Sequence, residues 1–175
     1  MKRGALTLAF ALAILVSSTF TRHLVNWARA TIGRSGMAMV LWVVAAIGAV
    51  VVLQWFWQMG RVRLTIALVL LAIAGWYLST FNVVEERVHF MKFALLAFLA
   101  CRDTRRSGAT KAVVSGIVLA ALVGGLDEVF QHYIPGRVGD PRDVLFDATG
   151  GVWGAVCWRV GWIPRDTSSI AGVDP

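Results

Sequence analysis

The segment that decides the fold lies at residues 111–131 and reads KAVVSGIVLAALVGGLDEVFQ. It is apolar or small from Ala112 to Leu126, and it then places two acids, Asp127 and Glu128, side by side. A helix needs about 20 predominantly apolar residues to cross the hydrocarbon of a bilayer. The segment therefore predicts a transmembrane helix that ends in two carboxylates.

The rest of the chain repeats this pattern of long apolar blocks, with breaks at glycine and proline. Of its 175 residues, 58% are hydrophobic and 15% are charged, whereas a soluble domain carries about 25% charged residues. We therefore predict an all-α fold, a polytopic transmembrane helical bundle of about six spans. It forms a single domain over residues 1–163, followed by a polar tail at 164–175. The expected spans are residues 4–20, 36–59, 64–81, 82–101, 111–131 and 143–163.

The N-terminal part allows two interpretations. The first apolar block follows Lys2 and Arg3 and is similar to a secretory signal, but no clean cleavage site comes after it. We therefore predict a retained helix. Residues 21–34 indicate a short interfacial helix, with Trp27 as its aromatic anchor.

The basic residues indicate how the bundle is oriented. The net charge is +7, and the Lys and Arg residues flank apolar blocks instead of forming a stripe, so we predict no nucleic-acid partner. With the N-terminus inside, the inner segments carry ten Lys and Arg residues and the outer segments six. The positive-inside rule then predicts a multi-pass protein of the cell (inner or plasma) membrane with both termini in the cytoplasm.

Most of the acids are expected at one membrane face, because the spans alternate in direction. They lie at the start of span 82–101, at the end of span 111–131 and at the start of span 143–163. Ionisable residues within spans are costly, and they usually face the interior of a bundle. The pattern predicts an outward-facing polar pocket between these three spans. Seven of the ten acids contribute: Glu85, Glu86, Asp127, Glu128, Asp140, Asp143 and Asp147.

Helical spacing places several of these residues on shared faces. Glu86, His89 and Lys92 follow each other at intervals of three, and Asp147 lies one turn after Asp143. Lys92 and Asp147 lie deepest, and an isolated charge at such a depth is expensive. We predict that these two side chains pair, directly or through one water or Glu128. The pair of glycines at 150 and 154 predicts close packing of the last helix on a neighbour.

Two blocks carry a resemblance to a known family. The first is Glu85-Glu86-Arg87-Val88-His89-Phe90; the second runs from Asp127-Glu128-x-x-Gln131 through Pro135-Gly136-Arg137 to Asp140-x-Arg142-Asp143. Over residues 82–160 the chain resembles the VanZ-like family of small membrane proteins. The resemblance implies a helical membrane fold and an association with resistance to a glycopeptide antibiotic, without a settled biochemical activity. The family's polar positions fall on Glu86, Arg87, His89, Asp127, Glu128, Gln131, Arg137 and Asp143; Lys92 and Asp147 complete the set of predicted ligand-binding residues.

The leading functional hypothesis is that the pocket binds or handles an amphipathic cell-envelope molecule, such as a lipid-linked headgroup or an antibiotic with a lipid tail. Arg87, Lys92 and Arg137 would hold a phosphate or carboxylate. Asp127, Glu128 and Gln131 would bind hydroxyls and amides. Membrane lipids are the expected partners, and we predict no cofactor, no metal and no catalytic residue.

Two other classes remain open. A metal-dependent membrane hydrolase would use Glu85, Glu86, His89, Glu128 and Asp143 to hold a divalent cation. The sequence has no nucleophile elbow, HExxH motif or paired histidines, which disfavours an enzyme. An accessory subunit of a larger membrane complex would explain the eight tryptophans, although an aromatic belt explains most of them equally well.

Overall fold

The computed structural model describes residues 4–81, 84–134 and 141–161, apart from the side chains of Arg22, Val84, Glu85 and Pro141. These ranges contain helices and no strand, which confirms the predicted all-α class. The helices are α1 (Ala5–Trp57), α2 (Arg61–Ser79), α3 (Val84–Thr104), the short 3-10 helix η1 (Arg105–Ser107), α4 (Ala109–Tyr133) and α5 (Pro141–Gly161).

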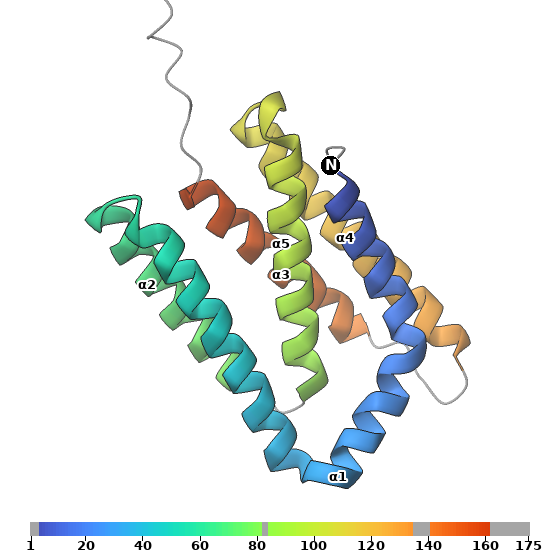
Figure 1. The fold of residues 1–175 in the computed structure, drawn as a ribbon. Helices are drawn as coiled ribbons and strands as arrows, with labels where there is room; N and C mark the ends of the chain where they lie inside the picture. The colour runs from blue at the N-terminus through green and yellow to red at the C-terminus, as the bar shows by residue number, and fades with distance from the viewer. Residues whose placement is uncertain (1–3, 82–83, 135–140, 162–175) are drawn as a thin grey trace, which may run out of the picture.

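Helix α1 is broken at Gly33, which has φ 69° and ψ 177°. Positive φ is a conformation that glycine adopts readily and other residues rarely do. The break divides α1 into a first arm (residues 5–32) and a second arm (residues 34–57), which diverge from the break as a V (Figure 1).

The separate interfacial helix expected at residues 21–34 is wrong, because the first arm continues through these residues to Gly33. Serine and threonine hydroxyls in this part bond back to carbonyls of the preceding turn: Ser17 to Ile14, Thr19 to Val16 and Thr21 to Ser17. Such bonds keep the polar side chains inside the helical pattern. The first glycine after Gly4 is Gly33, and the helix ends there.

Successive helical segments run in alternating directions (Figure 1). As a result, the start of α3, the end of α4 and the start of α5 lie at the same end of the bundle, which is also the end where α1 turns. For the described residues, the prediction that these three acid-bearing helix ends lie together is therefore confirmed, at one end of the bundle.

In the part of the chain that the structure describes, three helical segments are long and apolar enough to cross a membrane: His23–Trp57, Arg61–Ser79 and Ala109–Tyr133. Helices α3 and α5 have 21 residues each, which is also a spanning length. They are less apolar because they carry His89, Lys92, Asp143 and Asp147.

Glycines bring α5 and α3 into close contact. A Cβ built at Gly150 would overlap the carbonyl oxygen of Phe90, and one at Gly154 would overlap that of Ala94. Both neighbours belong to the backbone of α3, so the two helices pack without an intervening side chain. The predicted close approach at Gly150 and Gly154 is confirmed, and it fixes how deep Asp147 lies relative to α3.

The first arm of α1 covers the groove between α3 and α4. Its buried face is formed by Thr7, Ala11, Ile14 and Ser18, which follow each other at helical spacing. The apolar members pack in one core cluster with α3 and α4; the cluster contains Ala11, Ile14, Phe93, Leu96, Ala97, Ala120 and Val123. One turn beyond Ile14, the same face presents Ser18.

A polar contact holds the far end of this arm. Thr7 Oγ1 donates a hydrogen bond of 2.5 Å to Asp103 Oδ2, and Arg102 Nη2 donates one of 2.9 Å to Asp103 Oδ1. Asp103 lies beyond the expected span 82–101. Partial burial raises the pKa of Asp103, but the hydrogen bonds from Thr7 and Arg102 outweigh burial and hold it below its ordinary value.

Candidate functional site

The two faces of α4 explain why its acids are buried. One face exposes large apolar side chains that suit lipid: Val118, Leu122, Leu126 and Val129. The opposite face is buried and consists of small or apolar residues as far as Gly124, followed on the same face by Asp127, Glu128 and Gln131. These three polar side chains lie inside the bundle because they share a face of α4 with the small residues that pack there.

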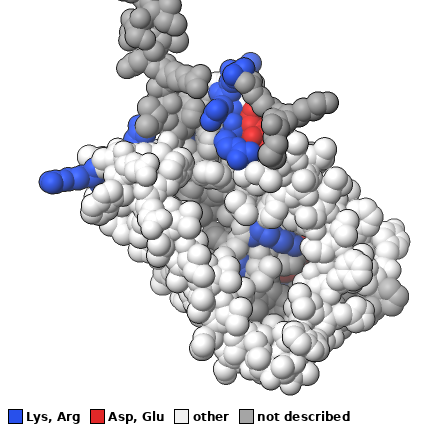
Figure 2. Space-filling view, in the orientation of Figure 1, with Lys and Arg blue, Asp and Glu red and all other residues white. Residues whose placement is uncertain are grey.

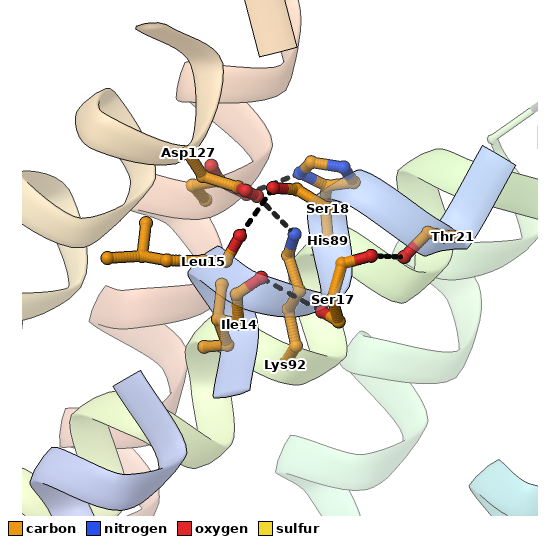
Figure 3. A network of polar contacts seen from close by, with 9 residues as sticks. Ile14, Leu15, Ser17, Ser18, Thr21, His89, Lys92 and Asp127 are labelled. Atoms are coloured by element: carbon orange, nitrogen blue, oxygen red, sulfur yellow. Dashed lines mark hydrogen bonds and ion pairs between the residues drawn. The ribbon is translucent and has the colours of Figure 1, made fainter. Parts of the chain in front are cut away.

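Helix α3 supplies the opposing groups. His89 and Lys92 lie one turn apart, and Phe93 and Leu96 continue the buried face of this helix. Lys92 Nζ donates a hydrogen bond of 2.6 Å to Asp127 Oδ2 on α4 (Figure 3). The side chain of Asp127 is 0% exposed and that of Lys92 is 19% exposed.

His89 forms the second interhelical pair. Its Nδ1 lies 2.9 Å from Asp147 Oδ1 on α5, and both side chains are buried. The other oxygen of Asp147 lies against α4, because a Cβ at Gly124 would come within 2.7 Å of Asp147 Oδ2. Because glycine has no Cβ, there is room at Gly124 for the carboxylate of Asp147.

The predicted direct pair between Lys92 and Asp147 is wrong. Lys92 bonds to Asp127 on α4, and Asp147 bonds to His89. The physical reason is the rotation of α3: positions three apart on a helix differ by about 60° in direction. This offset lets His89 face α5 while Lys92 faces α4.

We define the polar cluster as six predicted residues that lie together: the partly buried Lys92 and the buried His89, Asp127, Glu128, Gln131 and Asp147. Single ligand atoms of His89, Glu128 and Asp147 lie within 4.8 Å of one another. Among the described residues, several buried atoms of the cluster lack a hydrogen-bond partner, including Asp127 Oδ1, Gln131 Nε2 and Asp147 Oδ2.

Arg87 does not join the polar cluster but bonds to the backbone near the end of α2. Arg87 donates from Nε to the carbonyl of Leu78 (3.1 Å) and from Nη2 to that of Phe81 (2.7 Å). Its guanidinium also lies 5.6 Å from the ring centre of Trp42. Arg87 thus satisfies carbonyls at the end of α2, an arrangement that favours a cation there.

Glu86 and Asp143 are partly exposed and lie one turn before His89 and Asp147 on their helices, nearer the end of the bundle. Arg137 lies outside the described residues, as do Asp140 and the side chain of Glu85.

Two residues near the cluster were missed by the sequence analysis. Ser18 on α1 is buried and lies close to His89, Lys92 and Asp127 in Figure 3. Its signal was the spacing of Thr7, Ala11, Ile14 and Ser18. Gly124 lies within an apolar span, and nothing in the sequence indicates that the carboxylate of Asp147 packs against it.

One face of the molecule is hollowed next to the cluster. In Figure 1, α3 lies between the two diverging arms of α1, and Figure 2 shows a hollow at this place with Lys or Arg atoms inside a largely uncharged surface. Lys92 belongs to α3 and retains part of its surface, whereas Asp127 behind it retains none.

A helical bundle with apolar outer faces and a buried polar cluster between α3, α4 and α5 defines a membrane protein with an internal polar site. The family model described as VanZ/LLP1 matches residues 6–162, and the chain therefore belongs to the VanZ/LLP1 family. This confirms the resemblance and extends it to the first helices. No curated protein and no solved structure matches the chain.

Proposed function

We propose that this membrane protein binds the polar headgroup of an amphipathic cell-envelope molecule, a lipid or a lipid-tailed antibiotic, through the hollow between the arms of α1. The apolar tail would lie in the bilayer against the exposed apolar surface, and the headgroup would reach the polar cluster past Lys92.

One observation on α4 carries the proposal. Asp127 Oδ1 is an acceptor and Gln131 Nε2 is a donor; they are one turn apart and buried, and neither has a hydrogen-bond partner among the described residues. A buried polar group without a partner costs about 1–3 kcal/mol. A hydroxyl or amide of a ligand both donates and accepts, so it suits this pair of atoms.

Pairing between helices explains the second oxygen of Asp127 without any ligand. The bond from Lys92 to Asp127 uses Oδ2 and leaves Oδ1. The expected use of Arg87 for a phosphate finds no support, because its Nε and Nη2 donate to the carbonyls of Leu78 and Phe81. Hydroxyl and amide groups therefore suit the cluster better than an anionic group does.

Removing the free donor should release the ligand without breaking an ion pair. In the Gln131→Leu variant, the amount of the co-purifying amphipathic molecule should fall about tenfold, the equivalent of one lost hydrogen bond. The measurement is mass spectrometry of lipids extracted from protein purified in mild detergent, compared with the bulk membrane. Gln54→Leu is the matched control, because Gln54 is an exposed residue of α1. An identical lipid composition in all three proteins would contradict the proposal.

The proposed orientation places the polar cluster nearer the outer face, with both termini in the cytoplasm. In a background that lacks Cys101 and Cys157, cysteines introduced at positions 137–140 should react with an impermeant thiol reagent added outside intact cells. Cysteines at positions 104–107, around η1, should react only after permeabilisation. The reverse labelling pattern would place the hollow towards the cytoplasm.

A further inference from the structure

We infer that His89, Glu128 and Asp147 form a binding site for one divalent transition-metal ion, at the end of the polar cluster formed by α3, α4 and α5. The ion would join the three helices. The inference goes beyond headgroup binding and does not require it, because the metal ligands all come from the protein.

The three donor side chains lie close enough together to share one ion. One ligand atom from each of the three side chains lies within 4.8 Å of the others, and all three residues are buried. Ligand atoms at about 2.0–2.2 Å from a zinc ion lie roughly 3.4 Å apart in a tetrahedral site. Small side-chain rotations would close the remaining distance.

The carboxylate of Asp147 also has an oxygen that is available to an ion. Asp147 accepts from His89 at Oδ1, but its buried Oδ2 has no hydrogen-bond partner among the described residues. This oxygen lies against Gly124, one turn before Glu128 on α4, so it points between the helices and not into lipid. A cation would satisfy an oxygen that has no access to water.

The donor set selects the class of metal. One imidazole and two carboxylates suit Zn²⁺, Mn²⁺ or Fe²⁺, whereas Mg²⁺ and Ca²⁺ prefer oxygen donors alone. His89 has two ring nitrogens, and the contact of Nδ1 with Asp147 restricts how the ring can turn. An ion held by both residues would replace this contact, with a ring nitrogen of His89 and an oxygen of Asp147 as its ligands.

The charge of Lys92 does not repel a cation at the site, because Asp127 neutralises it. Their mutual bond of 2.6 Å compensates the ammonium within the cluster. The remaining groups of the cluster are then one imidazole, one amide and two carboxylates. A divalent ion would balance the carboxylate of Asp147, whose Oδ2 has no hydrogen-bond partner among the described residues, in a region where uncompensated charge is costly.

The test is a metal titration of the full chain, purified with a tag that contains no histidine. The wild-type protein should bind about one equivalent of Zn²⁺ or Mn²⁺, and its affinity for that ion should fall at least about tenfold in Asp147→Asn and in Glu128→Gln. Asp103→Asn is the matched control: its carboxylate lies on the same helix as His89 but bonds to Thr7 and Arg102. It should bind metal as the wild type does.

A second readout remains informative if a variant fails to fold. Co²⁺ added to the wild-type protein should give visible absorption bands, and Zn²⁺ should abolish them by displacement. Wild-type protein that takes up none of these ions in a saturable way would overturn the inference, and saturable binding of Mg²⁺ or Ca²⁺ alone would overturn the choice of metal class. Lipid retention is measured separately, so a failure of the metal site is distinguishable from a failure of headgroup binding.

Discussion

The Gly154→Ala variant should lose about 3 kcal/mol or more of stability, because its new Cβ would overlap the carbonyl oxygen of Ala94 on α3. Backbone cannot yield as a flexible side chain does, so α3 and α5 would have to separate. The contact of His89 with Asp147 joins these two helices and should weaken as well. The measurement is the thermal unfolding of purified protein in mild detergent, together with its yield as a monodisperse species.

Gly125→Ala is the control for this prediction. Gly125 also lies within a helix, but a Cβ there would meet nothing within 4 Å. Alanine is favoured over glycine in a helix by about 1 kcal/mol, so this variant should be as stable as the wild type or more stable. Equal losses in both variants would show that the α3–α5 contact is looser than described.

The second large effect concerns the pair formed by Lys92 and Asp127. Asp127→Asn would leave the ammonium of Lys92 without its counterion, and Lys92→Met would leave a fully buried carboxylate. Breaking a buried pair on one side costs about 3–5 kcal/mol, whereas replacing both partners by neutral groups costs much less. The double variant should therefore be more stable than either single variant, as measured by denaturant unfolding of the protein in detergent.

Two further double-mutant cycles test whether the coupling between Lys92 and Asp127 is specific. Lys92→Met combined with Asp103→Asn should give additive losses, because Asp103 bonds at the other end of α3. Lys92→Met combined with Asp147→Asn should couple more weakly than Lys92→Met with Asp127→Asn, since Asp147 bonds to His89. If Lys92 coupled more strongly to Asp147 than to Asp127, the pairing of Lys92 with Asp147 expected from the sequence would be right.

The sequence was sufficient to predict where the polar residues gather, because that depends only on span order. Alternating spans place Asp127, Asp147 and His89 at the same end of the bundle, whatever the rotation of each helix. Partner choice depends on rotation, and the offset of about 60° between positions three apart decides it. Spacing along one helix cannot tell which of His89 and Lys92 faces α4 and which faces α5.

The two other differences have local causes. The sequence could not show that Arg87 lies outside the cluster. Its partners are backbone carbonyls at the end of α2, and every residue type has such a carbonyl. The first helix was expected to end near residue 20, where hydropathy falls. It continues to Gly33 because hydroxyl side chains in this part bond to their own helix and do not interrupt it.

The central claim is that the polar cluster receives a headgroup through the hollow between the arms of α1. The most direct measurement is a cryo-EM structure of the protein in nanodiscs made with lipids from its host membrane. The account predicts headgroup density within hydrogen-bond distance of Asp127 Oδ1 and Gln131 Nε2, with the tail leaving past Lys92 between the two arms. A cluster closed by protein side chains, with lipid density only on the outer surface, would contradict it.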